Sequence, residues 1–408
     1  MSEETRVLVI EDSMVLIRPL CRMVEEIGLT PVPVCSLLEV REALASGQSF
    51  LAAVADYNLP DSPGGEHLPL LFQQAIPTIV LTSRNDGEVR DRILQLPVVD
   101  YVSKESPAAF DYVMRMLTRI RKNPGIKVLV VDDSASYRQF LRENLERHRY
   151  QVLEAEDAKQ ALEILHRDKH IKLVLSDNDM PGMDGVRMTS TIRRFLDHDR
   201  LAIIGISGNQ DPTMTTRFIK AGADDFLQKP FNFEEFFCRI TRNVEFVENL
   251  ESLKETADRD PLTGLSNRRH FFEQVMQLKS GYGVAVLDID HFKQVNDQYG
   301  HDVGDQVICN TARLMEQFFP DGIVARFGGE EFVILSPCPI ELDMVCRLES
   351  LRVALESCIL TTVKGGLRYT VSIGVAASDM PEISRLLKLA DERLYHAKQH
   401  GRNQVCGG

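Results

Sequence analysis

The sequence predicts an α/β protein in which two doubly wound, parallel-sheet domains precede a third α/β domain. The first observation is a repeat: RVLVIEDS (6–13) returns as KVLVVDDS (127–134), and VADYNLPD (54–61) returns as LSDNDMPG (175–182). Both pairs lie 121 residues apart, so the chain holds two copies of one unit. The second is that short apolar runs alternate with amphipathic helical stretches in each copy, which favours a parallel sheet. The third is a different series of motifs after residue 258.

Polar side chains are expected at the carboxyl ends of the strands in both copies, where parallel sheets form their ligand crevice. They are Glu11, Asp12, Asp56, Thr82 and Lys104 in the first copy and Asp132, Asp133, Asp177, Ser207 and Lys229 in the second. Three clustered carboxylates suit a hard cation such as Mg²⁺. A lysine and a hydroxyl beside them can hold the oxygens of a phosphoryl group on the central aspartate.

Both copies resemble response-regulator receiver domains, over residues 5–122 and 126–245. The resemblance implies a flavodoxin-like fold, a Mg²⁺ ion in each copy with Mn²⁺ as an alternative, and a sensor histidine kinase or phosphotransfer protein as partner. It implies the following roles: phosphoacceptors Asp56 and Asp177, metal ligands Glu11, Asp12, Asp132 and Asp133, and switch residues Thr82, Tyr101, Lys104, Ser207, Phe226 and Lys229.

The first copy departs from the pattern more than the second. It has DYNLPDSPGG (56–65) where the second has DNDMPGMDG (177–185), and it lacks the proline that follows Lys229. The alternative is therefore a docking module that keeps the fold without the chemistry. All five chemical positions of the first copy are nevertheless filled.

Composition bounds the class of protein. The 408 residues have 44% hydrophobic and 26% charged side chains, which is typical of globular proteins, and the net charge of −13 argues against nucleic acid as the main partner. No secretory signal or bilayer-length apolar run is present, so we expect no membrane insertion. The eight cysteines are scattered without a C-x-x-C pair, which predicts reduced thiols in a cytoplasmic protein.

The connector over 232–259 contains neither proline nor glycine. Ile240, Val244 and Val247 lie at 4–3 spacing, and a second series follows one step out of register: Phe246, Leu250, Leu253 and Ala257. This pattern predicts the last receiver helix running into a short coiled coil with a phase shift. The alternative is an amphipathic helix that packs on its own domain.

Six motifs follow in order. They are DPLTGLSNRR (260–269), AVLDIDHFKQVND (285–297), YGHDVGDQ (299–306), VARFGGEEFVIL (324–335), VSIGVA (371–376) and YHAKQHGRN (395–403). The fourth predicts a hairpin whose tip is Gly-Gly. If this hairpin pairs beside the strand 285–287, Asp288 and Glu330 converge on a metal, and the glycines let a nucleotide approach the backbone. Paired acids around Mg²⁺ suit phosphoryl or nucleotidyl transfer.

Residues 258–405 resemble a GGDEF domain, the catalytic domain of diguanylate cyclases, in its Gly-Gly-Glu-Glu-Phe form. The resemblance implies a ferredoxin-like or cyclase-type fold and a homodimer that condenses two GTP molecules to cyclic di-GMP, with Mg²⁺ or Mn²⁺. It implies these roles: metal ligands Asp288, Ile289 (by its carbonyl) and Glu330; catalytic residues Glu330 and Glu331; GTP-binding residues Lys293, Asn296, His301, Asp305, Gly328, Gly329, Lys398 and Arg402.

An inhibitory product site is expected to be missing. Many diguanylate cyclases carry Arg-x-x-Asp five residues before Gly-Gly, and those positions here are Phe319 and Gly322. A second site built from Arg313 or Arg352 stays open. The expected domains are 1–122, 126–245, a helical coiled-coil linker over 246–259 and a catalytic domain over 260–408. Rival readings are an inactive GTP or cyclic di-GMP receptor and a phosphorelay scaffold.

Overall fold

The computed structural model divides into two compact units, residues 1–251 and 252–408, which are described separately. It describes residues 5–83, 87–104, 108–208, 211–276, 281–337, 340–378 and 382–408. No helix within these ranges is long and apolar enough to cross a bilayer. The seven cysteines within them are free thiols, and Cys338 lies outside the described residues.

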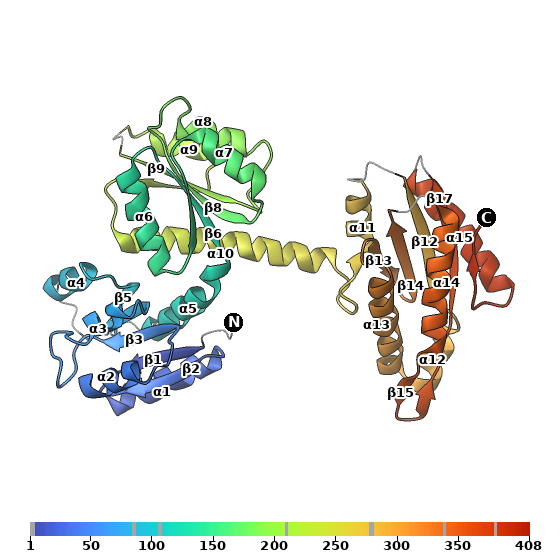
Figure 1. Ribbon diagram of the computed structural model, residues 1–408, viewed down its shortest axis with the longest axis horizontal. Coiled ribbons are helices and arrows are strands. Elements are labelled where there is room, and N and C mark those ends of the chain that lie inside the picture. The colour runs from blue at the N-terminus through green and yellow to red at the C-terminus, as the bar shows by residue number, and fades with distance from the viewer. Residues whose placement is uncertain are drawn as a thin grey trace. The chain divides into compact units, whose positions relative to one another are not determined.

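The first domain has a parallel sheet in the order β2-β1-β3-β4-β5, the flavodoxin-like order (Figure 1). Its strands are β1 (Arg6–Ile10), β2 (Thr30–Val34), β3 (Ala52–Asp56), β4 (Thr78–Thr82) and β5 (Asp100–Ser103). Its helices are α1 (Met14–Glu26), α2 (Leu37–Ala45), α3 (Leu68–Gln73), α4 (Gly87–Leu94) and α5 (Ala109–Lys122). Val7 and Val9 of β1 face α1 and α5, whereas Leu8 and Ile10 face the other helices, so both sheet faces are covered.

The second domain repeats this topology, with the order β7-β6-β8-β9-β10. Its strands are β6 (Lys127–Val131), β7 (Gln151–Ala155), β8 (Ile171–Asp177), β9 (Ala202–Ser207) and β10 (Asp225–Gln228). Its helices are α6 (Ala135–Arg147), α7 (Ala158–Arg167), α8 (Gly185–Ile192), α9 (Met214–Ala221) and α10 (Phe233–Asp258). The predicted alternation of strands with helices is confirmed in both domains.

The packing of helix α10 explains why the connector has two apolar series that are out of register with each other. Ile240, Val244 and Val247 are fully buried in the core of the second domain, whereas Phe246 is 51% and Leu253 is 65% exposed. The first series therefore packs on its own domain, as the alternative reading proposed. The second series lies on a solvent-facing side of the same uninterrupted helix and is free to meet a partner.

A buried polar network joins the first domain to the second. Arg119 of α5 forms an ion pair with Glu248 of α10, and its Nη2 donates to Asn123 Oδ1 at 2.8 Å. Asn123 Nδ2 donates to the backbone carbonyl of His148 at 2.7 Å. The His148 ring stacks on Phe237 with 3.4 Å between ring centroids. Arg119, Asn123 and His148 are at most 3% exposed, so this junction is as well buried as a core.

The C-terminal domain has a six-stranded sheet in the order β11-β13-β14-β12-β17-β18. Its strands are β11 (Ser266–Asn267), β12 (Tyr282–Ile289), β13 (Ile323–Gly328), β14 (Glu331–Ser336), β17 (Val371–Ser378) and β18 (Val405–Cys406), beside a small hairpin of β15 (Leu360–Thr362) and β16 (Gly365–Leu367). Its helices are α11 (Arg268–Val275), α12 (Phe292–Tyr299), α13 (His301–Phe318), α14 (Glu341–Ser357) and α15 (Ile383–Gln399). The four central strands have the ferredoxin-like order, and the predicted hairpin is confirmed as β13 and β14.

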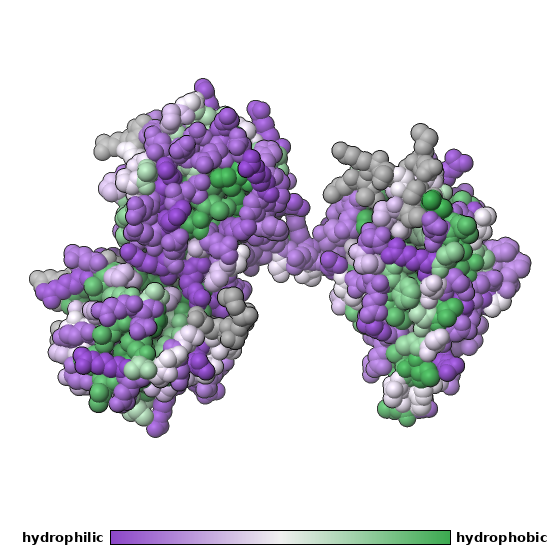
Figure 2. All heavy atoms as spheres, viewed as in Figure 1, coloured by the Kyte–Doolittle hydropathy of each residue, from purple (hydrophilic) through white to green (hydrophobic). Residues whose placement is uncertain are grey.

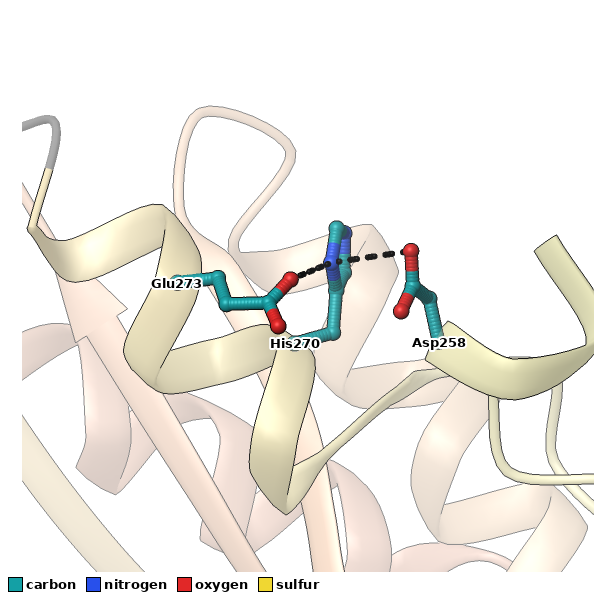
Figure 3. Close-up of side chains that lie close together, drawn as sticks. All are labelled: Asp258, His270 and Glu273. Carbon is teal, nitrogen blue, oxygen red and sulfur yellow. Dashed lines mark ion pairs between the residues drawn. The ribbon is translucent and has the colours of Figure 1, made fainter. Parts of the chain in front are cut away.

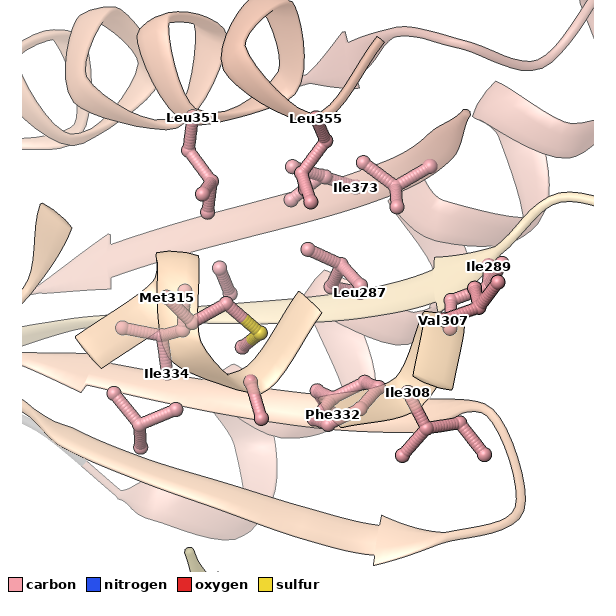
Figure 4. Close-up of a cluster of buried hydrophobic side chains, with 14 of the residues drawn as sticks. Leu287, Ile289, Val307, Ile308, Met315, Phe332, Ile334, Leu351, Leu355 and Ile373 are labelled. Carbon is pink, nitrogen blue, oxygen red and sulfur yellow. The ribbon is translucent and has the colours of Figure 1, made fainter. Parts of the chain in front are cut away.

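Helices cover both faces of this sheet. Phe332 and Ile334 of β14 point into a core shared with α13 and α14, where Leu351 and Leu355 also lie (Figure 4). Val333 and its alternate neighbours face α11 and α15 instead. This two-sided burial fixes the register of the strands, because a slip by one residue would exchange the two apolar faces.

The surface is mainly hydrophilic in the view of Figure 2, with separate hydrophobic patches. One patch lies at the end of the C-terminal domain that carries β15 (Figures 1 and 2). Here Ile359 is 54% and Val363 is 100% exposed. Exposed apolar side chains are common on folded proteins.

We expect the buried His148 to make the stability of the protein fall in mild acid. Burial lowers its pKa to about 3. The unfolded chain takes up a proton near pH 6.5 and the folded chain does not, so about 2 kcal/mol of the free energy of unfolding is lost between pH 7.5 and pH 5. Urea denaturation at the two pH values should show a loss that is smaller by about 2 kcal/mol in His148→Phe, which keeps the stacked ring, than in the wild type.

The matched control is His170→Phe, because His170 is exposed. This variant should keep the pH dependence of the wild type. An unchanged pH dependence in His148→Phe would contradict the assignment.

Candidate functional site

In the first domain, a lysine and two buried acids meet at the carboxyl edge of the sheet. Lys104 Nζ lies 2.6 Å from Glu11 Oε2 and 2.7 Å from Asp56 Oδ2. One oxygen each from Glu11, Asp12 and Asp56 lies within 4.8 Å of the others, a spacing suited to one cation. Burial raises the pKa of Glu11, and Lys104 opposes that shift. The sequence-predicted acids therefore come together.

The second domain repeats the contacts between a lysine and two buried acids. Lys229 Nζ lies 3.0 Å from Asp132 Oδ2 and 2.7 Å from Asp177 Oδ1, and it also covers the Tyr137 ring at 3.7 Å. Burial raises the pKa of Asp177, against the attraction of Lys229. Asp133 is exposed beside them. Lys229 therefore lies close to two of the three predicted acids.

The other predicted switch positions line the same sheet edges. Thr82 and Ser207 end β4 and β9 and are fully buried. Phe226 of β10 is 6% exposed and lies 5.5 Å from the Phe218 ring, whereas Tyr101 of β5 is half-buried. The two domains therefore differ at the aromatic position.

The C-terminal sheet brings three carboxylates together at one end of β12. Asp288 lies opposite Glu331 in the antiparallel register of β12 and β14, and Glu330 immediately precedes β14. Burial raises the pKa of Asp288, the Lys398 ammonium 2.8 Å from its Oδ2 lowers it, and Glu330 and Glu331 raise it again. Carboxylate oxygens are ligands for Mg²⁺ or Mn²⁺, and the metal role of Asp288 and Glu330 stays a prediction.

The side chain of Arg326, a residue that the sequence analysis did not single out, stabilises the Gly-Gly turn by hydrogen bonds. Gly328 and Gly329 have φ angles of 149° and 52°, which L side chains rarely adopt. Arg326 donates through Nε and Nη2 to the Gly329 carbonyl at 2.9 and 2.8 Å. Its Nη1 donates to Asp260 Oδ1 at 3.0 Å. Arg326 therefore ties the turn that carries Glu330 to the first C-terminal motif.

Asn296 presents an unused acceptor next to the turn between α12 and α13. Its Oδ1 is buried and has no hydrogen-bond partner among the described residues. A Cβ on Gly304 would lie 1.9 Å from this oxygen, so a larger residue there would displace the Asn296 amide. A buried polar atom without a partner is costly, which is consistent with a site that a ligand completes. Lys293, His301 and Asp305 are exposed on the same two helices.

Asp290 is a structural anchor. Its carboxylate accepts from Thr370 Oγ1 and Ser372 Oγ at 2.7 Å each and from the Asn403 backbone at 3.0 Å. These bonds fix the start of the segment after α15, where Arg402 is exposed. The Ile289 side chain, by contrast, is 1% exposed in the core, which leaves only its backbone for a ligand.

Comparison with known proteins matches two separate parts of the chain to two families. The family model "Diguanylate cyclase, GGDEF domain" matches residues 257–404, and "Response regulator receiver domain" matches 128–241. A solved structure of a two-component system response regulator/GGDEF domain protein is 34% identical, with a TM-score of 0.53. The alignment covers 60% of this chain and 100% of that one. The chain belongs to the response regulators with a GGDEF domain.

This response regulator is also similar to curated proteins. The response regulator PleD of Caulobacter vibrioides is 33% identical over 304 residues, which are 69% of this chain and 66% of PleD. The diguanylate cyclase DgcM of Escherichia coli is 41% identical over 165 residues, 38% of this chain and 39% of DgcM. The match to the GGDEF family model and the similarity to a protein named diguanylate cyclase support diguanylate cyclase activity for this chain. The receiver model covers the second repeat; the first shares its strand order.

At the two positions expected for an Arg-x-x-Asp product site, the chain has Phe319 and Gly322. Phe319, at the expected arginine position, is buried, and the Arg347 guanidinium carbon lies 4.4 Å from the centre of its ring. Arg347 Nη2 donates to Asp321 Oδ1 at 2.6 Å, so this nearby aspartate is already paired.

The two alternative arginines also have partners. Arg352 bonds to Glu349 and Glu356, and Arg313 bonds to Asn310.

We therefore expect micromolar cyclic di-GMP to inhibit this response regulator weakly or not at all. A missing arginine–phosphate pair removes roughly 1.5–3 kcal/mol, about a tenfold to hundredfold loss of affinity. Initial rates of pyrophosphate release from GTP, measured with increasing added cyclic di-GMP, test this expectation. Strong non-competitive inhibition at low micromolar product would contradict it.

Proposed function

We propose that this response regulator is a phosphorylation-controlled diguanylate cyclase. In a homodimer, the GGDEF domain of each subunit holds one GTP, and the two GTP molecules are joined as cyclic di-GMP. In each of two steps, a 3′-oxygen forms a bond to the α-phosphorus of the other GTP and pyrophosphate leaves. The observation that carries the proposal is the convergence of Asp288, Glu330 and Glu331 at the end of β12.

The carboxylates suit the reacting end of GTP. Asp288, Glu330 and the Ile289 carbonyl would hold Mg²⁺ or Mn²⁺, which supplies Lewis-acid stabilisation of the phosphates. Glu330 accepts the proton of the attacking 3′-hydroxyl, with Glu331 beside it. Lys293, Lys398 and Arg402 are proposed to contact the phosphates. Lys398 has the reach for this role because its ammonium already lies at Asp288.

The proposed guanine contacts use the unused acceptor at Asn296. Its Oδ1 and Nδ2 offer one acceptor and one donor group, and Asp305 adds a carboxylate acceptor for guanine N–H groups. Gly328 and Gly329 leave space for the nucleotide, since a Cβ there would extend into open space. His301 is exposed and lies on the same helix as Asp305, which is compatible with a minor contact.

Control is proposed to pass through the N-terminal domains and α10. Both Asp56 and Asp177 are candidate phosphoacceptors, each with a lysine within 2.7 Å and acids suited to Mg²⁺. A phosphoryl group adds charge that can change how the domains pair. The exposed Phe246 and Leu253 of α10 favour a partner helix in a homodimer. The proposed phosphodonor is a sensor kinase or phosphotransfer protein in the cytoplasm.

Two other functions fit less of the molecule. An inactive receptor for GTP or cyclic di-GMP would not need both Asp288 and Glu330, and this chain has both. A phosphorelay scaffold would leave the orphan Asn296 oxygen and the anchored Gly-Gly turn without a role. Nucleic acid and membrane insertion play no part in the proposal.

The first test is Glu330→Gln, which keeps the shape of the side chain and removes its charge. Incubation of the full chain with GTP and Mg²⁺, followed by liquid chromatography, should give cyclic di-GMP from the wild type. The variant should lose about a hundredfold or more of this rate, since it lacks both an anionic ligand and a proton acceptor. ATP should not replace GTP, because the guanine contacts would be left unpaired.

Glu392→Gln is the matched control, since Glu392 is exposed on α15. It should keep wild-type turnover. Product at the wild-type rate from Glu330→Gln would refute the assignment, and so would a folded wild type that forms none both with and without beryllofluoride.

The second test concerns phosphorylation of Asp177. Beryllofluoride, a phosphoryl mimic, should change both the turnover and the dimer population of the wild type, measured by chromatography and by analytical ultracentrifugation. Asp177→Asn should lose part or all of this response, because its lysine-held carboxylate is the proposed acceptor.

Asp56→Asn and the double variant assign the remainder of the response. If the double variant responds like the wild type, neither aspartate carries the signal and the proposed control is wrong.

A further inference from the structure

Three side chains with metal-binding atoms converge where α10 ends and the C-terminal domain begins. Asp258 is the last residue of α10, and His270 and Glu273 lie on α11 (Figure 3). One ligand atom from each lies within 4.8 Å of the others. All three belong to the unit 252–408, and none is among the residues proposed for GTP or phosphoryl chemistry.

The atoms of this cluster are spaced for an ion between them. His270 Nδ1 lies 3.4 Å from Asp258 Oδ2 and 3.7 Å from Glu273 Oε2. Both distances exceed a good N–H···O hydrogen bond, which is about 2.7–3.2 Å. Two ligands bound at 2.0–2.1 Å around a tetrahedral ion lie about 3.3 Å apart. His270 Nδ1 is also buried and has no hydrogen-bond partner among the described residues.

The outer oxygens of both carboxylates are directed to Arg269. Its Nη2 donates to Asp258 Oδ1 at 2.6 Å, and its Nε lies 3.9 Å from Glu273 Oε1. Each carboxylate therefore turns one oxygen to the guanidinium and its other oxygen to His270. The Arg269 guanidinium orients both carboxylates, as outer hydrogen-bond partners do in established metal sites.

The junction between α10 and α11 has its own hydrogen bonds without the cluster. Asn267 Nδ2 and Arg269 Nη2 donate to the Ala257 carbonyl at 2.6 and 3.0 Å, and Asn267 Oδ1 accepts from the His270 backbone at 3.0 Å. These bonds satisfy backbone groups at the end of one helix and the start of the next. The inward atoms of Asp258, His270 and Glu273 take no part in these bonds and, in the part of the chain that the structure describes, make only the long ion pairs with one another that Figure 3 marks.

We propose that Asp258, His270 and Glu273 bind one divalent transition-metal ion of the Zn²⁺ class. An imidazole with two carboxylates is a ligand set for zinc and its neighbours, whereas Mg²⁺ prefers oxygen ligands alone. The side chains of Asp258 and His270 are 21% and 23% exposed, so the ion has a route from solvent. Three protein ligands leave one position for water. The bound ion clasps the end of α10 to α11.

The test uses the full chain in millimolar Mg²⁺, which occupies the oxygen-ligand sites. Calorimetric titration with Zn²⁺ should show a site that is lost in His270→Ala. Its affinity should fall about tenfold or more in Glu273→Gln, which removes a charge from a half-exposed side chain and leaves the fold intact. Hydrogen exchange of residues 252–258 should slow when Zn²⁺ is added to the wild type, and should not respond in Glu273→Gln.

Glu255→Gln is the matched control, because Glu255 is exposed near the end of α10. This variant should bind Zn²⁺ as the wild type does. No Zn²⁺ binding by the wild type in excess Mg²⁺ would overturn the proposal, and so would equal affinity in the wild type and Glu273→Gln. If His270→Ala does not fold, Glu273→Gln decides the question alone.

Discussion

The antiparallel pairing of β12 with β14 is the constraint on which the C-terminal domain depends. It sets Asp288 opposite Glu331 and leaves Glu330 at the turn, so three acids from two sequence motifs share one end of the sheet. Leu287 and Phe332 are buried beside them in the same core. Because both faces of the sheet are covered, a register slip would bury the wrong side chains along the whole strand. Packing that extends far from the acids thus fixes where they lie.

The same ion pair, between a lysine and a buried aspartate, occurs at three strand ends. Lys104, Lys229 and Lys398 each place an ammonium within 2.8 Å of a buried aspartate oxygen. A buried carboxylate without a counter-charge is costly, and the lysine offsets that cost until a ligand arrives. A compact ammonium on a flexible stem can then move aside, which the planar fork of arginine does less readily. Arginine appears instead at Gly329 and Asp258, where the geometry has to stay fixed.

The sequence was sufficient for the parallel sheets, the hairpin and the acids at the strand ends, because periodicity and turn residues are local signals. It was insufficient wherever a long-range contact decides. Ile240 and Phe246 both fit a helical repeat, and only the packing of α10 shows that the first is buried in its own domain and the second is exposed. No local sequence pattern distinguishes Arg326 from the other arginines, because its contact with Asp260 forms only in the folded domain. The cluster at Asp258 joins segments whose individual residues carry no motif.

The uninterrupted backbone of α10 sets a rule for how its length can vary in evolution. Val247 is buried in the second domain and Leu253 is exposed on the same helix. Each residue added between them would turn Leu253 by about 100° around the helix axis and carry it about 1.5 Å further along. An insertion of seven residues nearly restores the original azimuth, whereas an insertion of two almost reverses it. In functional homologues, the length of this segment should therefore differ by insertions or deletions close to multiples of seven residues, which keep the direction of Leu253 around the helix axis.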